Sequence, residues 1–247
     1  MKHLTSLLFA LLLTLSTFGN ETFDAANTSY EAGDFAAAQT LYLELAEEYE
    51  SAPLYFNLGN TYYRQNDFVS AILWYERARK LAPADENIKD NLALANARIV
   101  DKPRTEELGD LEASWREFVY NPEPGAWTFW SILAMCGAFA LLAAFLFLKK
   151  PGLKRLTFYS GLAIIPVAIF FFILSYLQQN AMKVEAAIIT SVNVYVKSAP
   201  SDTGTDVLIL NAGTKVDLIR ERKEGWVELK APNGESGWLQ KEHITDI

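Results

Sequence analysis

The sequence predicts a multidomain membrane protein with an all-α repeat array, a two-helix transmembrane hairpin and a small all-β barrel. Three observations support this order. A 33-residue repeat recurs near the N-terminus, two apolar runs without charge occupy the middle, and the C-terminal part alternates apolar and polar residues. Of the 247 residues, 51% are hydrophobic while the formal net charge is -8, which fits a membrane protein whose soluble parts are acidic.

Composition and motifs argue against several function classes. An acidic balance disfavours nucleic acid as a partner. The single cysteine, Cys136, lies inside an apolar run, and the two histidines, His3 and His243, stand at opposite ends of the chain. The sequence holds no phosphate-binding glycine loop, nucleophile elbow or metal-ligand spacing. We therefore expect no catalytic residues, no metal, no cofactor and no enzymatic activity.

Residues 1–19 have a basic start, about a dozen apolar residues and a small-residue end, which is typical of a secretory signal peptide. An uncleaved anchor is the alternative. In both cases we expect the following residues to be exported.

Residues 20–103 contain the repeat. Residues 30–42 and 63–75 share Tyr, Asp-Phe, Ala and Tyr at an offset of 33. The second copy resembles a tetratricopeptide repeat, which implies a solenoid of paired helices. Helix 85–100 is expected to cap the open end of that solenoid as a solvated surface. The residues that carry the resemblance are Tyr55, Leu58, Gly59, Tyr62, Ala71, Tyr75, Ala78 and Pro83.

In a tetratricopeptide array, set positions of the first helix of each pair line a concave groove. The resemblance assigns a peptide-binding role to nine residues here: Asn27, Tyr30, Phe56, Asn60, Tyr63, Arg64, Asp90, Leu94 and Arg98. Asparagine at the same position of two repeats suits a groove that binds a peptide backbone or a carboxylate. The lysines of the carboxylate-clamp subtype are missing, which disfavours capture of a terminal carboxylate.

Residues 104–126 form an amphipathic linker. Leu108, Leu111, Trp115 and Phe118 share one helical face, and acidic residues occupy the other. Two interpretations stay open: a short helix lying on the membrane surface, or a plain linker helix.

Residues 127–148 and 156–178 are the two predicted transmembrane helices, because each exceeds the ~20 apolar residues that cross a bilayer. The intervening turn, residues 149–155, carries four cations, which the positive-inside rule keeps in the cytoplasm. Both soluble domains are then periplasmic, at the inner membrane of a bacterium. The topology-determining cations are Lys149, Lys150, Lys154 and Arg155.

Residues 184–247 predict a small barrel of about five short strands with glycine and proline at its corners. Two Gly-Trp pairs, at Trp226 and Trp238, each enter a strand, and this pattern resembles bacterial SH3 domains. The resemblance places Tyr195, Trp226 and Trp238 either in the core or on the ligand surface. We expect one tryptophan to close the core and the other to form an aromatic shelf, without assigning which.

The order of these parts, with residues 91–102 leading out of the repeats, resembles the Bacteroides aerotolerance (Bat) family. The resemblance implies a membrane-bound component acting beside von Willebrand factor A-type membrane proteins and a MoxR-type ATPase, in tolerance of oxygen or envelope stress. Two functions follow as expectations: a scaffold that binds protein partners, or an anchor that binds murein peptide through the SH3-like domain.

Overall fold

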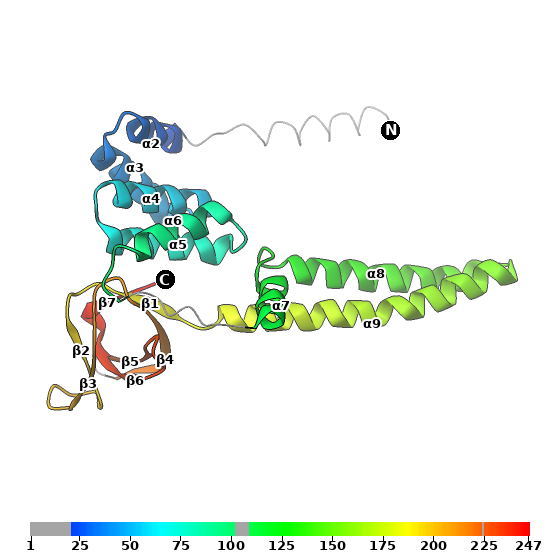
Figure 1. The fold of residues 1–247 in the computed structure, drawn as a ribbon. Coiled ribbons are helices and arrows are strands. Elements are labelled where there is room, and N and C mark those ends of the chain that lie inside the picture. The colour runs from blue at the N-terminus through cyan, green and yellow to red at the C-terminus, as the bar shows by residue number, and fades with distance from the viewer. Residues whose placement is uncertain (1–20, 102–108, 224) are drawn as a thin grey trace.

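The computed structural model describes residues 21–101, 109–223 and 225–247. It confirms the predicted order of a helical array, two long apolar helices and an antiparallel sheet (Figure 1). The predicted signal peptide and Leu108 lie outside the described residues. The array and the sheet lie together at one end of the hairpin, and the hairpin extends away from both.

Five helices form the array, and aspartate or serine caps four of them. The side chain of Asp34 accepts a hydrogen bond from the Ala37 amide at 3.0 Å, and Asp67 repeats this bond with Ser70 at 3.0 Å. These N-caps begin the second helix of each pair at the same place in each repeat. The helices are α2 (Glu21–Glu31), α3 (Phe35–Glu48), α4 (Ala52–Arg64), α5 (Phe68–Leu81) and α6 (Glu86–Asn96).

Gly59 is the point of closest approach between α4 and α5. It is buried, and a Cβ placed on it would overlap the ring of Tyr75, which is 1% exposed. The absence of a side chain at Gly59 is therefore what lets the Tyr75 ring lie flat against α4. Ala71 and Ala78, both fully buried, provide the same close packing along α5.

A hydrogen-bonded triad of side chains repeats along the array. The Asn27 side-chain oxygen accepts from the Tyr42 hydroxyl at 2.6 Å and from the Asn57 amide at 3.1 Å. One repeat later, the Asn60 oxygen accepts from the Tyr75 hydroxyl at 2.8 Å and from the Asn91 amide at 2.9 Å. Each triad thus joins a first helix, its own second helix and the first helix of the next pair.

Burial makes both tyrosines of these triads harder to ionise. Removal from water raises the pKa of Tyr42 and of Tyr75 above the ordinary value of 10.0, which is already well above physiological pH. Each hydroxyl is therefore protonated and acts as the donor to asparagine.

Three helices follow the array: α7 (Asp110–Tyr120), α8 (Ala126–Phe147) and α9 (Pro151–Met182). By length and composition, α8 and α9 are able to cross a membrane. The predicted basic turn is shorter than expected, because α9 already begins at Pro151. Proline suits the first turn of a helix, where its missing amide donor is not needed. Lys154 and Arg155 therefore belong to α9, at the tip that lies farthest from the soluble parts (Figure 1).

Polar side chains join the hairpin near its inner end. The Trp127 ring nitrogen donates to the Val119 carbonyl at 2.9 Å, and Gln178 donates to the Pro122 carbonyl at 2.7 Å. Ser131 donates to the Ala168 carbonyl at 3.0 Å. The bond to Val119 ties α7 to the base of the hairpin, the bond to Pro122 holds the connection after α7, and the Ser131 bond joins α8 to α9.

The C-terminal part is one antiparallel sheet in the order β3-β2-β6-β5-β4-β1-β7, with more strands than the five or so expected. It curves around a core of aliphatic side chains such as Val196, Val216, Leu229 and Leu239 (Figure 1). The elements are β1 (Ala186–Ile189), β2 (Val194–Lys197), β3 (Asp206–Leu210), β4 (Lys215–Lys223), β5 (Trp226–Lys230), β6 (Ser236–Gln240), the short 3-10 helix η1 (Lys241–His243) and β7 (Ile244–Asp246).

The sheet covers the end of the array, which we expected α6 to leave solvated. Ile188 of β1 is fully buried in one cluster with Ile72 of α5 and Leu92 and Ala95 of α6. The expectation was wrong because α6 carries a second apolar face that needs a partner. The sheet supplies that partner although it follows in sequence only after the hairpin.

Polar contacts fix the same junction. The Glu76 carboxylate is 5% exposed and lies 2.8 Å from the Lys215 amine of β4 and 2.7 Å from the Arg79 guanidinium. Arg77 donates to the Asp246 carbonyl at 2.8 Å. Asp101 accepts from the Asn211 backbone amide at 2.7 Å. The array and the sheet are thus joined by both apolar and ionic contacts.

The packing at Gly59 makes a direct prediction for stability. Gly59→Ala should lower the free energy of unfolding of the array by about 1–3 kcal/mol, because the added methyl group displaces the Tyr75 ring. Thermal unfolding in detergent, followed by circular dichroism, measures this. Gly137→Ala is the control, since a Cβ there meets nothing within 4 Å in α8. Equal melting temperatures for the two variants would contradict the packing argument.

Candidate protein-binding surfaces

The first candidate surface is a small groove on the array, with a volume of about 180 Å³. It is enclosed by the first helices α2, α4 and α6, with one side chain from α5 at its floor. The structure brings five of the nine predicted groove residues to this place, together with two that were not predicted. The predicted ones are Tyr30, Asn60, Tyr63, Arg64 and Leu94, and the others are Tyr75 and Asn91.

Aromatic rings hold the cation of this groove in position. The Arg64 guanidinium lies 5.2 Å from the centre of the Phe35 ring, and Phe35 in turn meets Tyr30 edge-on at 5.3 Å. Tyr63 makes a similar edge contact with Phe68 at 5.4 Å. The groove therefore presents one oriented positive charge among aromatic rings, a combination that suits a peptide with an acidic or polar side chain.

Asn60 contributes less to this surface than its position suggested. A carbonyl oxygen has two lone pairs, and the Asn60 oxygen already accepts from Tyr75 and Asn91. A bound peptide can therefore use the Asn60 amide nitrogen but competes with the fold for its oxygen. Asn27 is engaged in the same way by Tyr42 and Asn57.

The other predicted groove residues lie around this surface. Phe56 is half-buried and packs beside the Tyr75 ring at 5.9 Å. Asp90 and Arg98 are exposed on the side of α6 and just after it, and the Arg98 guanidinium lies 5.6 Å from the Phe68 ring centre. A peptide-binding role for these residues stays a prediction.

The second candidate surface is a depression of about 270 Å³ on the sheet. Tyr195, which is 51% exposed, and Trp226 line it together with Asn193, whose φ of 55° places its backbone in the left-handed region. His243 lies at its edge, with Nδ1 3.0 Å from the Ser191 hydroxyl. The depression thus combines two aromatic side chains with polar neighbours.

Neither tryptophan of the sheet belongs to its buried core, which corrects the expectation that one of them would. Val227, Leu229 and Leu239 point inward, so strand alternation places Trp226 and Trp238 on the outer face. Glu228 pairs with Trp238 across β5 and β6 on that same face. Aliphatic side chains from several strands already fill the interior, which leaves no place for an indole ring.

Sequence reasoning missed Asn57, Asn91 and Tyr42, although a signal for them exists. The asparagines are 34 residues apart, and Tyr42 and Tyr75 are 33 apart, so each recurs at the repeat period.

Among the described residues, the structure holds no group of three His, Cys, Asp or Glu side chains able to bind a metal ion. Both surfaces are lined by aromatic and polar side chains.

Comparison with known families agrees with the helical geometry in one part of the chain. The tetratricopeptide repeat model matches residues 52–85, which are the pair α4 and α5 and the connection to α6. No curated protein matches the sequence. The α4–α5 pair is therefore a tetratricopeptide repeat, a unit whose general use is protein–protein interaction.

Proposed function

We propose that this protein is a non-enzymatic scaffold, anchored in the membrane by α8 and α9, that binds protein partners through the array and the sheet. The observation that carries the proposal is the groove at Tyr63 and Arg64, which lies in an array containing a tetratricopeptide repeat. The groove is small and holds only one or two side chains of a partner. The depression at Tyr195 and Trp226 offers a second contact, and two linked weak sites give a higher combined affinity.

The proposed location is a bacterial inner membrane, with the array and the sheet in the periplasm. Direct contact between Glu76 and Lys215 supports placing both parts on one side of the bilayer. The four cations at the far tip of the hairpin support a cytoplasmic turn. The apolar N-terminal residues support export.

The physiological setting follows from the resemblance to the Bacteroides aerotolerance family. It suggests von Willebrand factor A-type membrane proteins and a MoxR-type ATPase system as partners, in oxygen tolerance or envelope stress. The repeat match is what supports protein partners in general; the family resemblance carries these particular ones.

The second candidate function is attachment to the cell wall, through a sheet that resembles bacterial SH3 domains. The depression with Tyr195 and Trp226 favours it, because aromatic rings pack on sugar and peptide groups. This function and the scaffold use different surfaces and are compatible.

The groove variant tests the scaffold. Tyr63→Ala combined with Arg64→Ala should weaken partner binding at least about tenfold, because an aromatic side chain and an arginine are typical hot spots. Partners captured by cross-linking and affinity purification in mild detergent are identified by mass spectrometry, and their binding is then titrated. Tyr49→Ala combined with Lys230→Ala is the matched control, since both residues are exposed outside the groove. Unchanged binding in the groove variant rules out this site.

Cysteine labelling tests the topology in a Cys136→Ser background. A membrane-impermeant maleimide should label Thr40→Cys in the array and Pro232→Cys in the sheet of intact spheroplasts, because both positions are exposed. Gly152→Cys, at the tip of the hairpin, should react only after lysis. The reverse pattern would overturn the proposed orientation.

Sedimentation with purified murein tests the cell-wall function in the full chain. The protein in detergent should pellet with murein, and Trp226→Ala should lower the bound fraction several-fold by removing one ring of the depression. Trp238→Ala is the control on the same outer face, outside the depression. If the wild-type chain stays in the supernatant, the murein proposal fails and the scaffold proposal is unaffected.

A further inference from the structure

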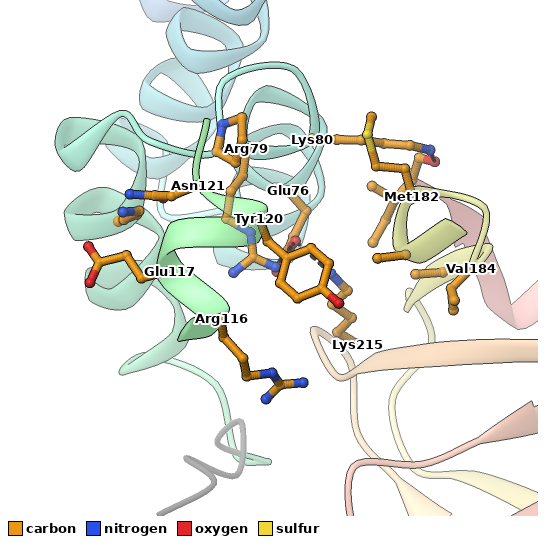
Figure 2. Close-up of a pocket in the computed structure, with 15 residues that line it drawn as sticks. Glu76, Arg79, Lys80, Arg116, Glu117, Tyr120, Asn121, Met182, Val184 and Lys215 are labelled. Atoms are coloured by element: carbon orange, nitrogen blue, oxygen red, sulfur yellow. Dashed lines mark hydrogen bonds and ion pairs between the residues drawn. The ribbon is translucent and has the colours of Figure 1, made fainter. Parts of the chain in front are cut away.

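A cleft of about 480 Å³ lies where the array, the hairpin and the sheet meet (Figure 2). Side chains from α5, α6 and α7 form one part of its wall, and the end of α9 with β1 and β4 forms the rest. None of the motifs found in the sequence points to it. It exists only because the sheet docks against α5 beside the base of the hairpin.

The cleft concentrates positive charge in an acidic chain. Of the residues that line it in the described part of the chain, five are cationic and two are acidic, while the whole chain has a formal net charge of -8. Such a local excess of cations attracts an anion. The two acids are Glu76 and Glu117, and the cations are Arg79, Lys80, Lys89, Arg116 and Lys215.

Glu76 organises two of these cations. Its buried carboxylate lies 2.7 Å from Arg79 and 2.8 Å from Lys215, so one acid orients two positive groups. Arg79 comes from α5 and Lys215 from β4, and they approach the cleft from opposite walls (Figure 2). Lys89 of α6 and Arg116 of α7 lie on two further elements of the wall, and the Lys89 amine also pairs with the Glu86 carboxylate at 2.9 Å.

The remaining lining residues lie at the base of the hairpin. Ala181 and Met182 are the last residues of α9, and Val184 follows that helix. Tyr120 of α7 also lines the cleft (Figure 2). On α7, Trp115 is 47% exposed and Phe118 is 46% exposed, and side chains of this kind suit lipid headgroups. With α8 and α9 in a membrane, as proposed above, these cations and apolar groups would lie together near headgroup depth.

We propose that this cleft binds a phosphate group, of the kind that an anionic phospholipid presents at the membrane surface. Arginine guanidinium groups match phosphate oxygens in geometry, and lysines add point charges. Ala181 and Met182, the α9 residues that line the cleft beside the cations, favour a lipid as the source of the phosphate, because acyl chains can continue along the helix. This inference rests on the proposed membrane anchoring and goes beyond partner binding.

The test uses the full chain in nanodiscs of phosphatidylcholine, with or without a minor fraction of phosphatidylglycerol. Phosphatidylglycerol should slow backbone hydrogen exchange in residues 79–89 and 116–121, and native mass spectrometry should show it retained on the protein. Arg116→Gln and Lys89→Gln should each lower the lipid affinity about fivefold. Melting temperatures near that of the wild type establish that both variants fold.

Lys183→Gln is the matched control. Lys183 is exposed between Met182 and Val184 at the same membrane surface, but it does not line the cleft. A specific site predicts little effect at Lys183. An equal loss of lipid affinity in all three variants would show that anionic lipid is attracted to the protein surface in general, and would overturn the proposal.

Inorganic phosphate, compared with chloride at equal ionic strength, separates the two sources of the ligand. Competition between phosphate and phosphatidylglycerol supports the site and a lipid ligand. If phosphate slows hydrogen exchange at the cleft but phosphatidylglycerol does not, the cleft is a phosphate site and a lipid is not the source of its ligand. Protection by neither overturns the proposal. Because the chain remains in the nanodisc in every case, these outcomes are independent of the anchoring itself.

Discussion

The contact between Ile188 of β1 and helices α5 and α6 constrains the rest of the structure, because it closes a loop of chain that contains the whole hairpin. A strand that docks on the array must lie on the same side as the array. For helices able to cross a membrane, as α8 and α9 are by length and composition, two crossings satisfy that requirement and one does not. Full burial of an isoleucine side chain contributes about 1.5–3 kcal/mol, and the ion pairs of Glu76 add directional contacts to it. Breaking one of these pairs leaves a buried charge poorly compensated.

Inside the array, one kind of contact sets the spacing of the helices and another fixes their register. Close packing at Gly59, Ala71 and Ala78 sets how near the helices approach, and this packing is apolar. The asparagine and tyrosine triads are directional and fix the register of one helix pair on the next. Whereas Asn60 and Tyr75 belong to a triad, Tyr63 and Arg64, on the neighbouring turn of α4, line the groove without taking part in one.

Much of the fold could be predicted from sequence because its signals are local. The repeat period, the charge-free apolar runs and the strand alternation each depend on residues close together in the chain. The Tyr30, Asn60, Tyr63, Arg64 and Leu94 cluster followed from the same period. The contact between the array and the sheet could not be predicted in this way, because Glu76 and Lys215 are 139 residues apart and neither belongs to a motif. The outward placement of Trp226 and Trp238 also depends on how aliphatic residues from several strands fill one core, which no single strand reveals.

The burial of Ile188 also has a consequence for the biogenesis of this protein. Residues of the array leave the ribosome first, and Ile72, Leu92 and Ala95 then form an apolar end that is still uncovered. That end stays open until the residues of the sheet, which follow both long apolar helices in the chain, have been synthesised. Until β1 docks, the array is an incomplete surface that chaperones can hold and proteases can attack. Docking of β1 thus distinguishes a fully assembled molecule from one whose sheet is not yet in place.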